Sequence, residues 1–300
     1  MKKKSVKTFS FSAWAFFIFL FPAAFFPFAV PAMDWPQAGA VLRGNFGHND
    51  QGRPQPGMIF EGGGPVRASD GGELVFSRGD GDDAASRLPS PLGAWAAVDH
   101  GDGLISIYGR FRDSGGKPPD TVNPGEIIAE SGVSGWSDSE GFFFALFDRR
   151  ERRWVNPSMI ITPLPDTRPP VIQSVRLRAP GNRLIDPAQT RTISQGRYTI
   201  EVAASDTMTA AGESPLAPHR IVCSVNGTEI GSLNFETCSA RDGVLMVSRN
   251  GLVPADQVYA PFPGFEVGEV GFTRGQATLE VIAQDIAGNT RSVVFRLVVE

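Results

Sequence analysis

Residues 99–111 carry the clearest structural signal in the chain and read Asp-His-Gly-Asp-Gly-Leu-Ile-Ser-Ile-Tyr-Gly-Arg-Phe. The glycines at 101 and 103 favour a tight turn. After them, Leu104, Ser106 and Tyr108 share one face of an extended segment, because successive side chains of a strand point to opposite faces. The stretch therefore predicts a turn followed by a strand.

The residues on either side of this stretch continue the same pattern. Between 33 and 165 the sequence is rich in glycine and short apolar runs, and no long segment has a helical period. Runs of this kind are typical of strands joined by turns. Further strands are expected at 57–61, 66–68, 73–78, 94–100, 126–130 and 141–147. This half of the chain is therefore predicted to be all-β, with a polar loop at 79–93 inserted at one edge of the sheet.

A second β region follows the pair Pro169-Pro170, since paired prolines favour an extended linker. Its short alternating strands, spaced by turns, are typical of a β-sandwich. They are expected at 171–178, 197–203, 220–225, 277–283 and 292–299. The segments 199–206 and 278–285 are near copies, which fits either equivalent strands of two small repeats or paired strands of one sandwich.

The two near copies each end in an aspartate, Asp206 and Asp285. Neither aspartate has a histidine or a second acid at a suitable spacing in the sequence. No catalytic group is therefore expected in the second half, which is predicted to be a spacer or docking module.

The first 32 residues have the three parts of a secretory signal. Lysines at 2, 3, 4 and 7 precede an apolar run at 13–30, and small residues around Pro31 lead to an expected cleavage after Ala32. The alternative is a membrane anchor, but prolines interrupt the apolar run and no stop-transfer charges follow it. The sequence predicts an exported protein, periplasmic or at the cell surface, with no stable membrane span after cleavage.

Removing this leader leaves 28 − 4 = 24 basic residues against 32 acidic residues, a net charge of −8. An acidic protein repels phosphate, so nucleic acid is excluded as a partner. Cys223 and Cys238 are the only cysteines. In an oxidising compartment they either form a disulfide or remain buried thiols, and the sequence leaves both possibilities open.

The sequence of residues 99–111 resembles the His-Gly-Asp-Gly … Tyr-x-His segment of the LytM or lysostaphin-like zinc endopeptidases, which cut peptidoglycan cross-bridges. Pro65-Val66-Arg67-Ala68 is similar to the family's Pro-Val-x-Ala hairpin, and 122–129 resembles its Val-x-x-Gly-x-x-Ile-Ala segment. Trp154-Val155-Asn156-Pro157 matches its closing Val-Asn-Pro. The resemblance implies a LytM-like β-sheet domain, of the duplicated hybrid motif type, at 33–165.

The end of the chain has a resemblance of its own. Asp285-Ile286-Ala287-Gly288-Asn289 and the strand after it resemble the Asp-x-x-Gly-Asn ending of bacterial immunoglobulin-like surface domains. This implies an immunoglobulin-like β-sandwich at 166–300. With the signal peptide at 1–32 and the LytM-like domain between them, the chain is expected to have two folded domains.

The family's zinc ligands and catalytic histidine are replaced in this chain. Its His-x-x-x-Asp corresponds to Gln55 and Ile59, its His-x-His to 142–144, and the histidine of its Tyr-x-His to Arg110. Apolar side chains cannot bind zinc, and arginine cannot act as a neutral base because its pKa exceeds about 12. The resemblance therefore implies a fold without zinc, other cofactors or catalysis, unless His48-Asn49-Asp50 and His100 build a relocated site in the first half.

What remains of such a site is the groove. Aromatic side chains with one arginine suit a carboxylate-bearing peptide or a partner helix. The candidate ligand-binding residues are Gln55, Tyr108, Arg110, Phe142 and Phe144, although the phenylalanines could equally fill space that the metal site vacated. The expected function is an exported, non-catalytic protein that binds peptidoglycan or regulates a cell-wall hydrolase. Two alternatives stay open: a zinc-dependent peptidoglycan endopeptidase with relocated ligands, and a structural surface or adhesion protein.

Overall fold

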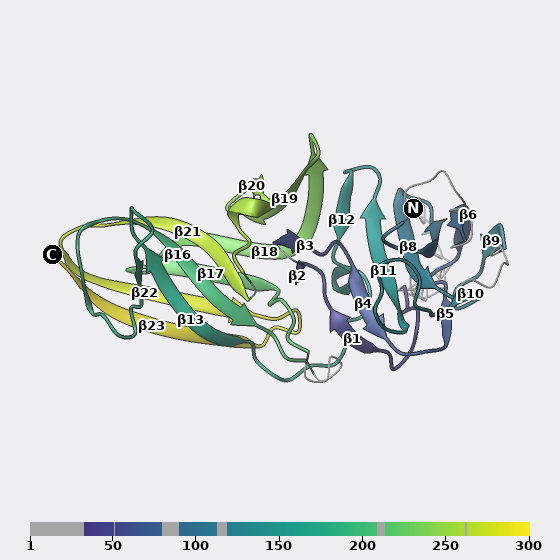
Figure 1. Cartoon of the computed structure of the whole chain (residues 1–300), viewed down its shortest axis with the longest axis horizontal. Helices are drawn as coiled ribbons and strands as arrows, with labels where there is room; N and C mark the ends of the chain where they lie inside the picture. Colours follow the sequence, from purple (N-terminus) through teal and green to yellow (C-terminus); the bar gives the residue numbers. More distant parts are fainter. Residues whose placement is uncertain (1–32, 51, 80–89, 113–118, 209–213, 262) are drawn as a thin grey trace, which may run out of the picture. The chain divides into compact units, whose positions relative to one another are not determined.

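The structure is a computed structural model, and it describes residues 33–50, 52–79, 90–112, 119–208, 214–261 and 263–300 (Figure 1). Regular structure in these residues is almost entirely β, and the helical segments among them are two single 3-10 turns, η2 (Pro157–Met159) and η4 (Ala255–Gln257). The prediction of an all-β chain is confirmed. No helix in this part of the chain is long and apolar enough to cross a membrane. The predicted leader at 1–32 lies outside the described residues.

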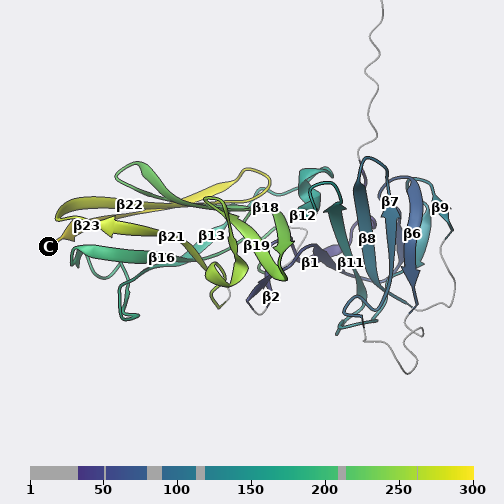
Figure 2. The same cartoon turned by 90° about the horizontal axis from the view of Figure 1, so that it is seen from above.

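The first half is built on one antiparallel sheet. Its strands are β1 (Val41–Gly44), β4 (Met58–Glu61), β6 (Gly72–Arg78), β7 (Ala94–Asp99), β8 (Leu104–Phe111), β9 (Thr121–Val122), β11 (Gly141–Asp148) and β12 (Arg153–Val155). Figure 2 shows β6, β7, β8 and β11 side by side. Two smaller pairs join β2 (Asn49–Asp50) to β3 (Arg53–Pro54), and β5 (Pro65–Arg67) to β10 (Ile127–Glu130).

The turn and strand predicted at 99–111 are the β7–β8 hairpin. Asp102 has a φ of 50°, and the glycines on either side of it, Gly101 and Gly103, have φ of 81° and 84°. Glycine adopts this left-handed backbone without the steric cost that a Cβ brings. The His100 backbone N–H donates to the Leu104 carbonyl at 3.0 Å and closes the turn. The hairpin then delivers β8 to the middle of the sheet, between β7 and β11.

The second half is a sandwich of two sheets, as predicted. One sheet contains β13 (Val171–Arg178), β14 (Leu184–Ile185), β16 (Gly196–Ser205) and β21 (Gly264–Phe272). The other layer contains β15 (Thr192–Ile193), β17 (Arg220–Val225), β18 (Thr228–Arg241), β19 (Val244–Arg249), β20 (Leu252–Pro254), β22 (Gly275–Gln284) and β23 (Thr290–Val299). These strands are continuous, through the pairing of β18 with β12, with the sheet of the first half. Apolar side chains from both sheets, such as Ile200 and Leu279, form one buried core between them.

The two near-copied segments occupy facing positions in this sandwich. Residues 199–206 run through β16 and residues 278–285 run through β22, and these strands belong to opposite sheets. The single sandwich was therefore the correct alternative, but the two strands do not pair with each other. β16 pairs with β13 and β21, and β22 pairs with β17 and β23.

Hydrogen bonds connect the two halves at several places. Strand β12 of the first half pairs with β18 of the second. The Asn45 amide donates to the Ala217 carbonyl at 2.7 Å and accepts from the Ala217 N–H at 2.9 Å. The Tyr259 hydroxyl donates to the Gly47 carbonyl at 2.8 Å. The described residues from 33 onwards belong to one compact unit. The division into domains at 33–165 and 166–300 thus stays a prediction.

The two cysteines are buried free thiols in this structure. Cys223 on β17 lies opposite Gly231 on β18, and Cys238 is seven residues further along β18. A strand rises about 3.3 Å per residue, so the two cysteines are separated by roughly 20 Å, far beyond the span of about 7 Å that a disulfide bridges. Of the two alternatives left open by the sequence, the structure has the buried thiols. Burial raises the pKa of the Cys238 thiol to about 11.

Candidate functional site

Strand β11 presents different side chains to the two sides of its sheet. Phe142 and Phe144 are 0% exposed and belong to the core of the first half, together with Tyr108, which is also 0% exposed. The rings of Tyr108 and Phe144 lie 5.3 Å apart. Fully buried side chains cannot contact a ligand, so the prediction that these three residues line a groove is wrong. They are inside because alternation turns every second residue of β11 towards the core.

Gln55 was also predicted to line the groove, and it is buried, with 7% of its surface exposed. Its Nε2 donates to the carbonyls of Gly44 and Gly57, at 3.3 Å and 3.2 Å. An amide of this kind satisfies backbone groups that would otherwise be buried without a partner. Gln55 therefore holds the approach to β4 in place, and the assignment to ligand binding is corrected.

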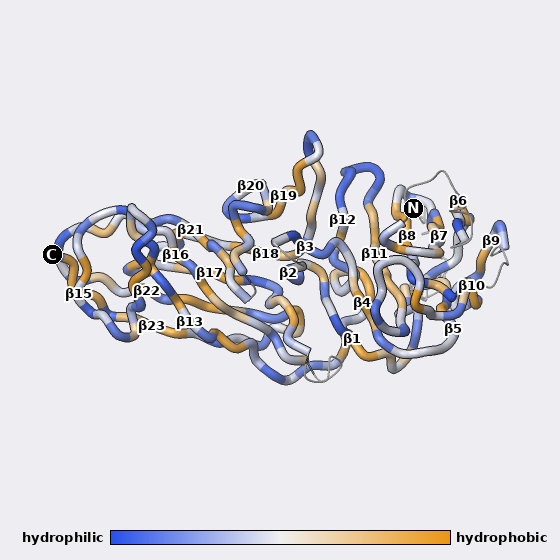
Figure 3. The backbone as a smooth tube through the Cα atoms, in the orientation of Figure 1, coloured by the Kyte–Doolittle hydropathy of each residue, from blue (hydrophilic) through white to orange (hydrophobic). Residues whose placement is uncertain are grey.

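The other face of β11 carries Phe143 and Ala145. In the register of the sheet, Phe143 lies opposite Ile59 of β4 on one side and Gly109 of β8 on the other. A Cβ on Gly57 would come within 2.6 Å of the Phe143 ring and 2.7 Å of the Ala145 Cβ. The sheet face that carries Ile59 is thus covered by closely packed apolar side chains. Their carbon atoms cannot ligate a metal ion. Figure 3 shows the apolar start of β4 beside the apolar run of β11.

Arg110 is the predicted site residue that keeps partial exposure. It has a φ of 67° inside β8, where the register with β7 shifts between Ala94 and Trp95, so it is the extra residue of a β-bulge. Its backbone N–H leaves the ladder and donates to the Leu92 carbonyl at 2.6 Å. A left-handed backbone is costly for a non-glycine residue, and bulges of this type re-aim a side chain next to functional sites.

Trp136, which the sequence analysis did not identify, lies beside the loop that contains Leu92. Trp136 is 73% exposed, the largest exposed fraction among the bulky apolar side chains of the described residues. Its backbone N–H donates to the Pro91 carbonyl at 3.1 Å, and the neighbouring Ser134 hydroxyl accepts from the Ala94 N–H at 3.0 Å. The adjacent carbonyls of Pro91 and Leu92 therefore hold Trp136 and Arg110 at one place. A tryptophan within Ser-Gly-Trp-Ser, where no neighbour is apolar, was the available signal.

His100 has a structural position. Its Nδ1 lies 2.9 Å from the Gly71 carbonyl, which can only accept, so Nδ1 carries the hydrogen. Its Nε2 lies 2.6 Å from the Ser106 hydroxyl, and Ser106 is 2.9 Å from the Tyr108 hydroxyl. Both nitrogens are therefore engaged in a chain of hydrogen bonds that ends in the core.

The structure does not gather the histidines into a relocated zinc site among the residues it describes. The one group of three potential metal ligands found in those residues consists of aspartates only, at 166, 206 and 285. His219 is half-buried, and this burial lowers the pKa of its imidazole. The expectation that the chain binds no zinc stays a prediction.

Replacing Tyr108 by phenylalanine is expected to lower the free energy of unfolding by about 1–3 kcal/mol, because buried polar groups lose their partner. The Tyr108 hydroxyl accepts from the Ser69 N–H at 2.8 Å, and burial raises the pKa of the phenol so that it stays protonated. Urea denaturation followed by circular dichroism measures the change. Unchanged stability would mean that the Ser69 N–H finds another acceptor and that the chain from His100 to Tyr108 is dispensable.

Three comparisons with known proteins give limited matches. One protein-family model, which carries no description, matches residues 169–300. A search of curated proteins gives no match. Among solved structures, a mutant form of the catalytic domain of the prophage-encoded M23 protein EnpA from Enterococcus faecalis is 21% identical with a TM-score of 0.35, covering 42% of this chain and 95% of that one.

Two further solved structures are similar to the chain. The antimicrobial peptidase lysostaphin from Staphylococcus simulans is 17% identical with a TM-score of 0.35, and the match covers 72% of this chain and 85% of that one. A chain of the SpoIIQ–SpoIIIAH pore forming complex is 17% identical with a TM-score of 0.34, covering 43% of this chain and 90% of that one. Similarity at this level does not show what this chain does. Its function is therefore argued from its own candidate site.

Proposed function

We propose that the chain is an exported, non-catalytic LytM-like protein of the cell envelope, and that it binds peptidoglycan through Arg110 and Trp136. The observation that carries the proposal is the pair of adjacent carbonyls at Pro91 and Leu92, which accept the backbone N–H groups of Trp136 and Arg110 and so bring the two residues to the same loop. The order of LytM-like motifs from Gln55 to Pro157 supports the fold assignment, and the leader supports export.

The two side chains suit the chemistry of peptidoglycan. Its peptide stems carry carboxylates, and a guanidinium binds a carboxylate through two parallel hydrogen bonds. Its glycan strands and peptides present flat or apolar faces, on which an exposed indole packs while its N–H remains available as a donor. Exposed tryptophan and arginine are also the residues that contribute most often to binding energy at interfaces.

The same residues disfavour a hydrolase. A catalytic zinc needs about three nitrogen, oxygen or sulfur ligands and an open position for the water that it activates. Ile59 and Phe143 present carbon atoms only, and the Gln55 Nε2 donates to two backbone carbonyls. A guanidinium group such as that of Arg110 is too weak a base to accept the proton of an attacking water.

Binding of the full-length protein to purified sacculi tests the proposal. Trp136→Ala is expected to weaken binding about tenfold, because truncating a tryptophan at an interface typically costs more than 1 kcal/mol. Arg110→Ala is expected to weaken it to a similar extent. Arg112→Ala is the matched control, since Arg112 is two residues further along, exposed, and paired with Glu140. Co-sedimentation at a series of sacculus concentrations gives the ratio of dissociation constants.

Undiminished binding by both Trp136→Ala and Arg110→Ala would overturn the assignment of these residues. Metal analysis and a muropeptide cleavage assay on the same preparation test the alternative: stoichiometric zinc together with turnover would show an active endopeptidase. A protein that ignores sacculi but binds a purified cell-wall hydrolase would instead be a regulator of that enzyme. Failure of both binding assays would favour a structural surface protein.

A further inference from the structure

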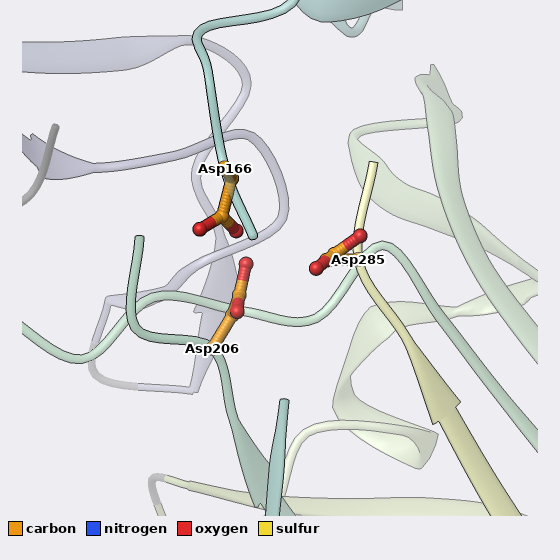
Figure 4. A group of neighbouring side chains, drawn as sticks. All are labelled: Asp166, Asp206 and Asp285. Carbon is orange, nitrogen blue, oxygen red and sulfur yellow. The ribbon is translucent and has the colours of Figure 1, made fainter. Parts of the chain in front are cut away.

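Three aspartates from distant parts of the sequence meet where the chain passes from the first half into the second. Asp166 precedes β13, Asp206 directly follows β16, and Asp285 directly follows β22. One carboxylate oxygen from each lies within 4.8 Å of the other two. Figure 4 shows the three carboxylates pointing towards one another. The near copies 199–206 and 278–285 explain part of this meeting, since both strands reach the same end of the sandwich and both finish in aspartate.

Two of the three aspartates are buried, and no arginine or lysine of the described residues forms an ion pair with the cluster. Asp206 is 3% exposed, Asp285 is 1% exposed and Asp166 is partly buried. Like charges this close in a poorly hydrated place repel each other strongly. A cation or bound protons must therefore balance the site.

Two oxygens in the cluster also lack hydrogen-bond donors. Asp285 is satisfied, because its oxygens accept from the backbone and side chain of Asn289, each at 2.8 Å. Asp206 accepts at Oδ1 from the Thr207 N–H at 2.8 Å, and its other oxygen receives no donor from the described residues, although the residue is only 3% exposed. Asp166 accepts at Oδ1 from the Arg168 N–H, whereas its Oδ2 is buried with no partner. Figure 4 shows the carboxylate groups of Asp166 and Asp206 turned towards each other.

We propose that Asp166, Asp206 and Asp285 form a Ca²⁺ site. Ca²⁺ binds carboxylate and water oxygens at about 2.3–2.6 Å, so oxygens on opposite sides of the ion are about 4.6–5.2 Å apart. The three oxygens lie within 4.8 Å of one another, so all of them can reach one ion of this size. Mg²⁺ needs a tighter shell, with opposite oxygens about 4.0–4.2 Å apart. Oxygen-only ligands exclude the softer zinc as the preferred ion.

Room for a water ligand is present next to Asp206. A cavity of about 20 Å³ borders this residue and is also lined by Asn45, Asn156 and Ser158, whose polar atoms can orient a water. A volume of about 10–15 Å³ is enough for one water molecule. One water held there would supply one further oxygen ligand to the ion.

A bound Ca²⁺ ion would hold the segment around residue 166 against the end of the sandwich. Asp166 belongs to the segment between η2 and β13, which has no strand of its own. A direct contact with the end of the sandwich is already present, since the Asn289 side chain lies 3.4 Å from the Asp166 carbonyl. Bound Ca²⁺ would add three charged ligands to this contact and tie residue 166 to the ends of β16 and β22.

The alternative to a cation is a shared proton. Burial, together with the charges of Asp285 and Asp166, raises the pKa of Asp206 to about 7. A protonated Asp206 could donate to a neighbouring carboxylate and balance part of the charge. The two possibilities differ in their response to Ca²⁺, which the experiment measures.

The test uses full-length protein treated with EDTA and then dialysed free of it. Isothermal titration with CaCl₂ is expected to show one site per chain, and saturating Ca²⁺ is expected to raise Tm by about 5–10 °C at a hundredfold excess over Kd. MgCl₂ is expected to bind at least tenfold more weakly, because its shell is smaller. Asp206→Asn and Asp166→Asn should each abolish most of the Tm response to Ca²⁺.

Asp186→Asn is the matched control. Asp186 also accepts a backbone N–H two residues ahead, from Ala188 at 2.8 Å, but lies outside the cluster. It should keep the full response to Ca²⁺. The proposal is overturned if the wild-type protein gives no heat and no Tm shift with Ca²⁺, or if Asp206→Asn and Asp166→Asn respond like the wild type. Should Asp206→Asn fail to fold, Asp166→Asn alone decides, since Asp166 is partly exposed.

Discussion

Replacement of Phe144 by alanine is expected to lower the free energy of unfolding by about 3–5 kcal/mol, the cost of removing a fully buried aromatic ring and leaving a cavity. Phe144 is 0% exposed, and its ring lies 5.3 Å from that of Tyr108 and 6.3 Å from that of Trp35. Two aromatic residues from separate segments, Tyr108 and Trp35, therefore lose a packing partner. Urea denaturation monitored by circular dichroism measures the loss.

Phe76→Ala is the control for this variant. Phe76 is 44% exposed and stacks on Trp95 at 4.3 Å, so its removal is expected to cost about 1 kcal/mol or less. The comparison separates the core from the surface of the same sheet. Nearly wild-type stability of Phe144→Ala, combined with a loss of binding to sacculi, would mean that Phe144 faces a ligand after all.

Much of the strand pattern was predictable because its signals are local. The glycines at 101 and 103 permit the left-handed turn, and the alternation after them is that of a half-buried strand. For the same reason most predicted strands lie within a residue or two of the observed ones. The long strand β18 (Thr228–Arg241) was missed, because its sequence includes several polar residues that obscure the alternation. Its pairing with β19 also shifts register between Asn234 and Cys238.

The orientation of β11 was not predictable in the same way. Alternation reveals the buried face of a strand when apolar and polar residues alternate, but Phe142, Phe143 and Phe144 are identical. Motif matching alone chose the first and third of them for the groove. The register with β4 and β8 reverses that choice and places Phe143 on the face of Ile59 and Gly109.

The aspartate cluster shows a second limit of sequence reasoning. Asp206 and Asp285 were set aside because no acid or histidine stood at a suitable spacing from either. Their partners come from facing sheets and from the segment before β13, so the distances depend on tertiary packing alone. Arg110 was identified from its motif position, and Trp136 was missed because no motif contained it.

Replacement of Phe235 by alanine is expected to have an effect as large as that of Phe144, about 3–5 kcal/mol, and to reach both halves of the chain. Phe235 is 1% exposed and packs against Phe265 at 5.5 Å in the sandwich core. It also touches the first half, since a Cβ on Gly47 would lie 2.5 Å from its ring. Its carbonyl accepts from the Asn156 amide at 3.0 Å.

Tryptophan fluorescence makes this variant a test of the predicted boundary at 165/166. The tryptophans that follow the leader are at 35, 95, 136 and 154, all in the first half, whereas Phe235 is in the second. If residues 33–300 unfold as one cooperative unit, Phe235→Ala shifts the fluorescence and circular dichroism transitions together. This is the expected result, because strand pairing and buried contacts join the halves.

Phe295→Ala provides the comparison within the sandwich. Phe295 is only partly buried on β23, so its loss is expected to cost less. Two separate transitions in the wild-type protein, with only the second one shifted by Phe235→Ala, would contradict cooperative unfolding. The halves would then be independent domains in the thermodynamic sense, and the contacts at Gly47 and Asn156 would contribute little to the stability of the first half.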